Sequence, residues 1–193
     1  MRLTKPRIAP IDTEQATPEV REMLDKARVG DSTANIFATL AHHPDLMRRW
    51  LRFGNHILFK NSLPAREREM VILRIGWLCR AGYEWGQHVA IARRDGMTDD
   101  EIQAIAKGPD DPHWSEADRA LLRATDELHA DAFISDATWA SLAASLSDHQ
   151  LLDLVFTVGQ YNMVSMVLNT FGVQLDEGVP TFEDAPGFRP DGL

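Results

Sequence analysis

The sequence is poor in cysteine and in basic residues, and both shortages exclude classes of function. Its 193 residues include a single cysteine, so no disulfide, structural or catalytic, forms within one chain. The 29 acidic residues outnumber the 20 basic ones and give a formal net charge of −9. Non-specific binding to nucleic acid or to an anionic membrane needs clustered lysine and arginine. We therefore expect neither nucleic acid nor a membrane among the partners.

Long hydrophobic runs are also absent. No segment approaches about 18 uninterrupted apolar residues, the length that indicates a membrane-spanning helix. The first ten residues, which include Pro6 and Pro10, lack the apolar stretch of an export signal. Together with the single cysteine, these absences predict a cytoplasmic protein. Hydrophobic residues make up 44% and charged residues 25% of the chain, the balance of an ordinary globular domain.

Strand-like alternation of apolar and polar residues is absent, whereas helix starts and stops are frequent. Capping boxes begin at Thr98 and Ser147, Pro18 suits a first helical turn, and Gly30 and Gly172 suit helix ends. The pattern predicts an all-α fold with about nine helices. We expect them over residues 17–28, 35–41, 44–57, 62–80, 83–95, from 98 onwards, and over 115–129, 135–145 and 147–170.

The helices predict one domain between two arms. Residues 1–16 are expected to form an extended N-terminal arm, residues 17–172 the helical domain, and residues 173–193 a C-terminal arm. The last segment holds three prolines and three glycines, and we expect it to pack on a neighbouring subunit. Within the domain, one buried stripe is expected along a helix that opens at Pro44, formed by Leu46, Trp50, Phe53 and Ile57.

Three polar residues stand on apolar helix faces. Glu69 is followed by Ile72 and Leu73 at i+3 and i+4, which places its carboxylate in an apolar stripe, with Arg66, Arg68 and Arg74 as surface candidates. Glu84 and His88 are four residues apart and share one face of the next helix. Burial raises the pKa of a carboxylic acid and a nearby carboxylate raises that of histidine, so such a pair can transfer protons near neutral pH.

The same spacing also suits ordinary structural roles. A Glu–His pair four residues apart is common on exposed helices, and Glu69 can form an ion pair with an arginine of another helix. The set Glu69, Glu84 and His88 also suits a metal site with two carboxylates and one imidazole. We favour a proton relay, because no additional metal ligand is evident. Tyr83 and Trp85 flank Glu84 and are expected to line the same cavity and contact the substrate.

Two segments of the sequence carry a family resemblance. Residues 69–74 (EMVILR) and 81–93 (AGYEWGQHVAIAR) resemble the carboxymuconolactone decarboxylase family, within the superfamily of alkylhydroperoxidase D-like proteins. Residues 35–37 (NIF), 43–44 (HP), 160–162 (QYN) and 168–169 (LN) agree with it. The resemblance covers roughly residues 10–175, and its core of Tyr-Glu-Trp-x-x-His is fairly specific.

The resemblance distinguishes two branches of the superfamily. The peroxidase branch has a glutamate, eleven residues, and then Cys-x-x-Cys-x-x-x-His. Glu69 and His88 match the ends of that pattern, but Ala81 and Glu84 occupy the two cysteine positions. A dithiol couple needs two thiols. The lone Cys79 lies near the end of a helix, where the helix dipole disfavours the thiolate, so the sequence resembles the thiol-independent decarboxylase branch.

The resemblance implies a homo-oligomer (dimer, trimer or hexamer) that acts on a small lactone acid or another intermediate of aromatic degradation. We expect no cofactor or metal, because none is needed if the substrate itself serves as electron sink. After loss of CO₂, a carbanion must receive a proton. We expect His88 to be the general acid, oriented by Glu84, with Glu69 completing the relay. The same residues suit isomerisation, lactone hydrolysis or dehydration. Two rival functions remain: a peroxiredoxin-type redox protein that uses Cys79, and a non-catalytic oligomeric binding protein.

Overall fold

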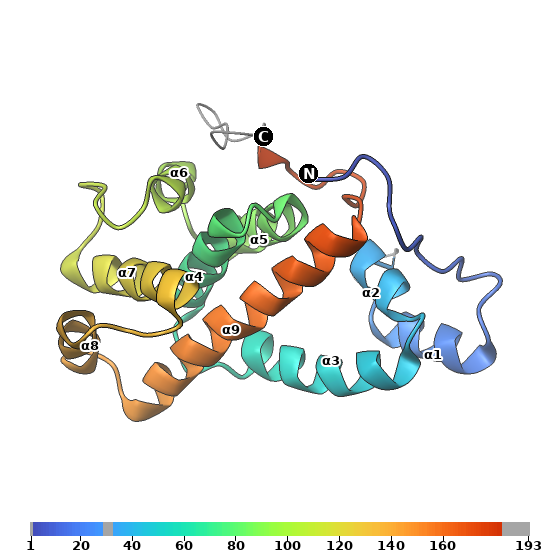
Figure 1. Ribbon diagram of the computed structural model, residues 1–193, viewed down its shortest axis with the longest axis horizontal. Helices are drawn as coiled ribbons and strands as arrows, with labels where there is room; N and C mark the ends of the chain where they lie inside the picture. Colours follow the sequence, from blue (N-terminus) through green and yellow to red (C-terminus); the bar gives the residue numbers. More distant parts are fainter. Residues whose placement is uncertain (1, 29–32, 183–193) are drawn as a thin grey trace.

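The computed structural model describes residues 2–28 and 33–182, and the elements in these ranges are nine α-helices (Figure 1). The predicted all-α class is therefore confirmed. The helices are α1 (Pro18–Lys26), α2 (Asn35–Leu40), α3 (Pro44–Phe59), α4 (Ala65–Leu78), α5 (Gly82–Arg94), α6 (Asp99–Lys107), α7 (Glu116–Asp131), α8 (Asp136–Ala143) and α9 (Asp148–Phe171).

Local capping chemistry determines most helix ends. The capping boxes predicted at Thr98 and Ser147 both form at the starts of α6 and α9. α9 ends at Gly172, whose φ of 67° lies in the left-handed region. α4 ends differently, because Arg80 adopts a left-handed φ of 53° just before α5 begins. The stop expected at Gly30 lies outside the described residues.

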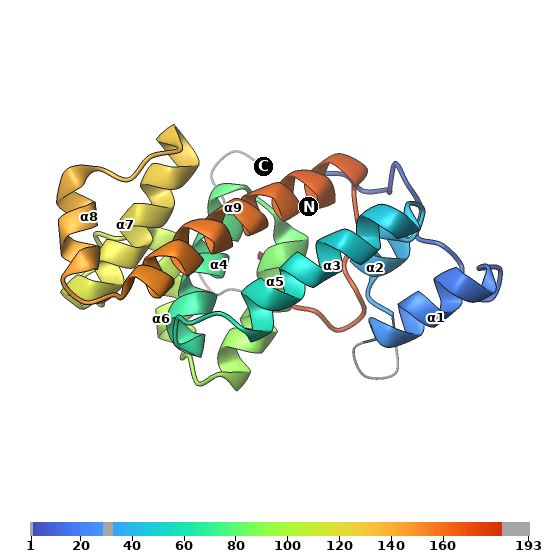
Figure 2. The same cartoon turned by 90° about the horizontal axis from the view of Figure 1, so that it is seen from below.

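Helix α4 is the centre of the fold. It contacts α5, α6, α7 and α9, and its residues 69–76 are all buried. α9 runs diagonally through the middle of the molecule in Figure 1, and α3 runs beside it in Figure 2. By length and composition α9 could cross a membrane, but half of its most apolar window is buried inside the protein. A core helix of a packed domain passes the same test, so this feature is weak evidence for a membrane.

The buried face of α3 differs from the predicted stripe. Leu46 is 51% exposed and Phe53 is 38% exposed, so two of the four predicted positions face outwards. Met47 and Ile57 are buried on this helix. α3 contacts only part of the domain, chiefly α2 and α9, and this one-sided packing decides which of its apolar residues are covered.

Arg74 was expected at the surface and is instead buried. Its guanidinium binds both oxygens of Asp126, with Nε–Oδ1 at 2.6 Å and Nη2–Oδ2 at 2.8 Å. Its Nη1 donates to the carbonyl oxygens of Ile105 and Ala106 at 3.0 Å each. Arginine stabilises the last carbonyls of a helix and binds carboxylates in a two-pronged geometry. The periodicity of α4 contains no information on such distant partners, so the surface expectation was wrong.

The C-terminal segment contacts helices of its own chain over its described part, residues 173–182. Asp176 accepts hydrogen bonds from the backbone N–H of Asn35 at 2.8 Å, from Tyr83 at 2.6 Å and from the Gln87 amide at 2.6 Å. This carboxylate therefore joins α2 and α5. Residues 183–193 of the expected arm lie outside the described residues.

Gly86 of α5 permits the close approach of this segment. A Cβ at this position would overlap the carbonyl oxygen of Pro180 and lie 2.7 Å from Cγ1 of Val179. We expect Gly86→Ala to lower the free energy of unfolding by about 1–3 kcal/mol and to speed hydrogen exchange in residues 173–182. Denaturant titration and hydrogen exchange measure both effects.

Ala90→Gly, at an exposed position of the same helix, is the control, since it adds no atom beside residues 173–182. Glycine lowers helix stability by about 1 kcal/mol, but this variant should leave hydrogen exchange in residues 173–182 unchanged. Unchanged exchange in Gly86→Ala would contradict a steric role for Gly86.

Candidate active site

Packing of α4 against α5 brings the three predicted polar residues together. Nδ1 of His88 lies 2.6 Å from Oε2 of Glu69, and Nε2 of His88 lies 2.9 Å from Oε1 of Glu84. All three side chains are buried. The imidazole thus joins two carboxylates, one from each helix, and both of its ring nitrogens are engaged.

Arg68 extends this arrangement behind Glu69. Its Nε donates to Oε1 of Glu69 at 3.0 Å, and its Nη2 lies 3.1 Å from Oδ2 of Asp95. Arg68 was expected on the surface, but only 12% of its side chain is exposed. Glu69 therefore lies between two cationic side chains, which offsets the cost of burying its carboxylate.

The electrostatics of the cluster favour a charged His88. Burial by itself lowers the pKa of His88, but Glu69 and Glu84 outweigh it and raise the pKa to about 10. Burial raises the pKa of Glu69, whereas His88 and Arg68 together bring it below its usual value. At neutral pH the pair is an imidazolium and a carboxylate. Over residues 2–28 and 33–182, no three His, Cys, Asp or Glu side chains are placed to hold a metal ion together.

A cavity of about 170 Å³ adjoins the cluster. Glu84 and His88 form part of its wall, whereas Glu69 lies behind them. A cavity of about 150 Å³ holds a benzene ring, so this one has room for one small ring. Its lining comes from α2, α3, α5, α9 and the residue before α2, and comprises Ala34, Ile36, Phe37, Trp50, Leu51, Gly54, Asn55, Leu58, Tyr83, Glu84, Gln87, His88, Ile91, Gln160, Tyr161 and Val164.

The described lining of the cavity contains no lysine or arginine. Its walls are apolar apart from a few amides and hydroxyls and the Glu84–His88 pair. The imidazolium of His88 is already bound by two carboxylates. A free carboxylate on a ligand would therefore lack a cationic partner here, and burying an unpaired charge is costly.

The two aromatic residues expected to contact a substrate are placed differently. Tyr83 lines the cavity, and its hydroxyl donates to Asp176 at 2.6 Å. Trp85 does not line it. Trp85 is buried in the main core, where its ring meets those of Trp77 and Phe182 at centroid distances of 5.3 and 5.6 Å. Successive side chains of a helix point about 100° apart. Tyr83 and Trp85 therefore point in different directions, although both are neighbours of Glu84 in the sequence.

Two further cavity residues, Gln160 and Tyr161, come from α9 and were not predicted as site residues. The ring of Tyr161 meets the His88 ring edge-on, with centroids 4.9 Å apart and planes at 84°. Gln160 is only 4% exposed. A glutamine among the apolar residues of this helix is a signal that could have identified Gln160 as a site residue. Polar side chains are uncommon in such positions, and buried ones need a hydrogen-bond partner.

Cys79 lies at the end of α4 and does not line the cavity. Its Sγ is 3.1 Å from Oδ1 of Asn162. Burial raises the pKa of this thiol above its ordinary value, so the nucleophilic thiolate is disfavoured.

Comparison with known structures shows the class of fold. A peroxidase-related protein with an alkylhydroperoxidase AhpD core from Ralstonia eutropha JMP134 aligns with a TM-score of 0.78 and 19% identity, covering 89% of this chain and 93% of its own. A peroxidase-related protein from Silicibacter sp. TM1040 aligns at 0.77 and 17%, covering 92% and 97%. A cysteine-to-alanine variant of the debrominase Bmp8, in complex with 2,3,4-tribromopyrrole, aligns at 0.70 and 16%, covering 90% and 94%.

These likenesses establish an AhpD-like helical fold. Within it, residues 44–127 match the sequence model of the carboxymuconolactone decarboxylase family, a segment that contains Glu69, Glu84 and His88. The resemblance stated from the sequence is thereby confirmed over this segment. Both positions of the redox cysteine pair are occupied by other residues, Ala81 and Glu84, in agreement with the single cysteine of the chain. No curated protein gives a significant match to the sequence.

Proposed function

We propose that the protein is a thiol-independent acid–base enzyme that moves a proton to or from carbon in a small ring compound. One observation carries the proposal: a buried carboxylate–imidazolium–carboxylate array ends at the wall of a cavity with room for one ring. The fold does not select the reaction, because its neighbours include peroxidase-related proteins and a debrominase.

The geometry supports a different division of roles from the one expected. Both nitrogens of His88 are engaged, so Glu84 is the carboxyl group that exchanges a proton with the ligand. His88 stabilises the charge on Glu84 and exchanges a proton with it through Nε2. Glu69, supported by Arg68, holds Nδ1 and thereby orients the imidazole. A correctly placed acid or base of this kind contributes about 10²- to 10⁴-fold to a rate.

The charges in the cavity lining also restrict which substrates can bind. Decarboxylation of a lactone acid, the reaction implied by the family resemblance, requires a cation beside the substrate carboxylate, and the described lining offers only the His88 imidazolium, which two carboxylates already bind. We therefore favour a neutral lactone or enolisable ring compound, in which the ring carbonyl accepts the developing negative charge. Isomerisation, or dehydration by a lyase-type reaction, meets this condition without an organic cofactor.

Solvent deuterium incorporation tests the proposal. A panel of small lactones, lactone acids and hydroxylated ring compounds is incubated with the protein in D₂O, and mass spectrometry follows deuterium at carbon. The proposal requires deuterium in at least one neutral compound with the wild-type protein. It fails if no compound exchanges, or if turnover occurs only with retention of the original hydrogen.

The two rival functions make opposite predictions about Cys79 and the cavity. A redox protein should lose activity in Cys79→Ser, whereas the acid–base enzyme should keep its deuterium incorporation. The raised pKa of Cys79 and its position outside the cavity favour the second outcome. A pocket without room beside Glu84 and His88 would favour a non-catalytic binding protein, and the cavity of about 170 Å³ provides that room. A cytoplasmic location stays an expectation from the sequence.

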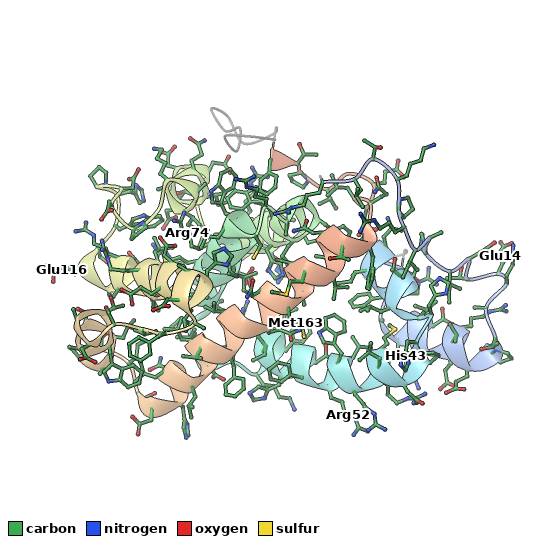
Figure 3. The ribbon with its side chains drawn as sticks, viewed as in Figure 1. Glu14, His43, Arg52, Arg74, Glu116 and Met163 are labelled. Atoms are coloured by element: carbon green, nitrogen blue, oxygen red, sulfur yellow. The ribbon has the colours of Figure 1, made fainter. Side chains whose placement is uncertain are left out.

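We also propose that the protein forms a homo-oligomer through the outer face of α9. Leu152, Phe156, Met163 and Met166 are exposed there, with Gly159 between them (Figure 3 marks Met163). These positions alternate spacings of four and three residues, which produces one continuous seam suited to pairing with another helix. The space beside Gly159 is open and would accommodate a partner side chain.

Sedimentation velocity should therefore give a mass that is a multiple of 21.7 kDa for the wild-type protein. Met163→Glu is expected to shift it to the monomer, because a buried unpaired carboxylate opposes association. Phe59→Glu, at the exposed end of α3 and off the α9 seam, is the control and should leave the mass unchanged. A monomeric wild-type protein would refute the assembly proposal.

A further inference from the structure

The side-chain amide of Gln160 is a buried polar group whose oxygen has no partner. Gln160 lines the cavity and is 4% exposed, and its Oε1 has no hydrogen bond to any described residue. Buried side-chain oxygens are hydrogen-bonded in the large majority of cases, and an unsatisfied one lowers stability. The other glutamine of the cavity, Gln87, differs because its amide already donates to Asp176 at 2.6 Å.

The surroundings of Gln160 restrict which ligand groups can form a hydrogen bond with its amide. Gly54 lies opposite Nε2, where an added Cβ would lie at van der Waals contact, 3.6 Å away, so the room for a ligand beside this amide is in the cavity that it lines. An amide can present either its oxygen or its N–H₂ group. A hydroxyl group or a ring N–H donates to the oxygen, and a hydroxyl can also accept from the nitrogen. A carboxylate only accepts, and it would also face the buried Glu84 without a lysine or arginine in the described lining.

We propose that Gln160 recognises the substrate by accepting a hydrogen bond from its hydroxyl or ring N–H, so that the ligand class is a neutral single ring with one such donor. That this ligand is a substrate rests on the proposed function, but the recognition itself is a binding property. The apolar wall from α3, with Trp50 and Leu58, covers the ring, and Gln160 determines its orientation relative to Glu84.

Binding of three single-ring probes tests the inference without turnover. NMR titration measures the affinity of phenol, which has a donor, anisole, which keeps the oxygen but lacks the donor, and benzoate, which is charged. We expect the wild-type protein to prefer phenol over anisole about fivefold, the effect of one net hydrogen bond, and to bind benzoate most weakly.

Gln160→Met preserves the approximate shape without the amide and should bind phenol and anisole equally. Gln160→Leu is a second variant with the same expectation, and neither should be less stable, because an unpaired polar group has been removed. Gln103→Leu, in α6 and outside the cavity lining, is the control and should keep the phenol preference.

Two results would overturn the inference: no binding of phenol by the wild-type protein, or an unchanged preference in both Gln160 variants. Failure of the proposed function has a different signature. It would appear as absent deuterium incorporation while the phenol preference of the wild-type protein persists.

Discussion

Glu84→Gln is expected to reduce turnover by about 10²- to 10⁴-fold, the effect of removing a positioned acid or base. Glutamine matches the shape of glutamate and can still meet Nε2 of His88, but it carries no proton that it can exchange near neutral pH. The loss should fall on kcat, because glutamine keeps the shape of the cavity wall and Gln160 is unchanged. Steady-state kinetics on a compound that exchanges deuterium measures the effect.

Glu116→Gln is the matched control. Glu116 is exposed at the start of α7, far from the cavity (Figure 3), and its replacement should leave kcat unchanged. His88→Gln should also lower kcat. Because His88 and Glu84 act in one array, the losses of kcat from the two substitutions should not be additive. Wild-type kcat in Glu84→Gln would remove this residue from the proton transfer.

Glu69→Leu is expected to lower the free energy of unfolding by about 3–5 kcal/mol, since it leaves buried cationic groups without their shared carboxylate. His88 would keep only Glu84, and Arg68 only Asp95. Denaturant titration measures the change. Glu116→Leu at the surface should cost less than about 1 kcal/mol. A similarly small cost for Glu69→Leu would show that the ion pair is not needed for the fold.

The difference in the free energy of unfolding between the wild type and Glu69→Leu should change with pH in a defined direction. The folded pKa of His88, about 10, exceeds its ordinary 6.5, so its stabilisation is complete below 6.5 and is lost progressively as the pH rises to about 10. The pKa of Glu69 is lowered from 4.5, so its stabilisation is present above that value and is lost as the pH falls through the folded pKa. The wild type should therefore exceed Glu69→Leu most between pH 4.5 and 6.5.

NMR titration of the imidazole checks the same point directly. His88 should stay protonated to about pH 10 in the wild type and titrate at lower pH in Glu69→Leu, where its largest stabilising partner is absent. An unchanged titration would mean that Glu69 does not govern the protonation of His88.

The sequence predicted the array of Glu69, Glu84 and His88 because two local signals coincide. Helical spacing placed Glu84 and His88 on one face and Glu69 in an apolar stripe, and the surrounding motif resembled a known family. The roles within the array were not predictable in the same way. The contact between Nδ1 and Glu69 joins residues 19 positions apart, so it depends on how α4 packs against α5.

Residues whose importance comes from distant partners were missed or misplaced. Arg68 and Arg74 were expected at the surface, and their carboxylate partners Asp95 and Asp126 lie 27 and 52 residues away. Asp176 was assigned to an arm, yet it accepts three hydrogen bonds from α2 and α5. A buried charge needs a partner, but periodicity does not say which element supplies it.

The sequence by itself determined the helical class, most helix ends and the loss of the redox pair, because capping, periodicity and residue identity are local properties. Only the tertiary structure decided that both nitrogens of His88 are engaged, that Trp85 belongs to the core, and that an uncharged amide from α9 faces the cavity. These features arise where α4, α5, α9 and the C-terminal segment pack together, since burial and pairing are defined by neighbours that packing brings together.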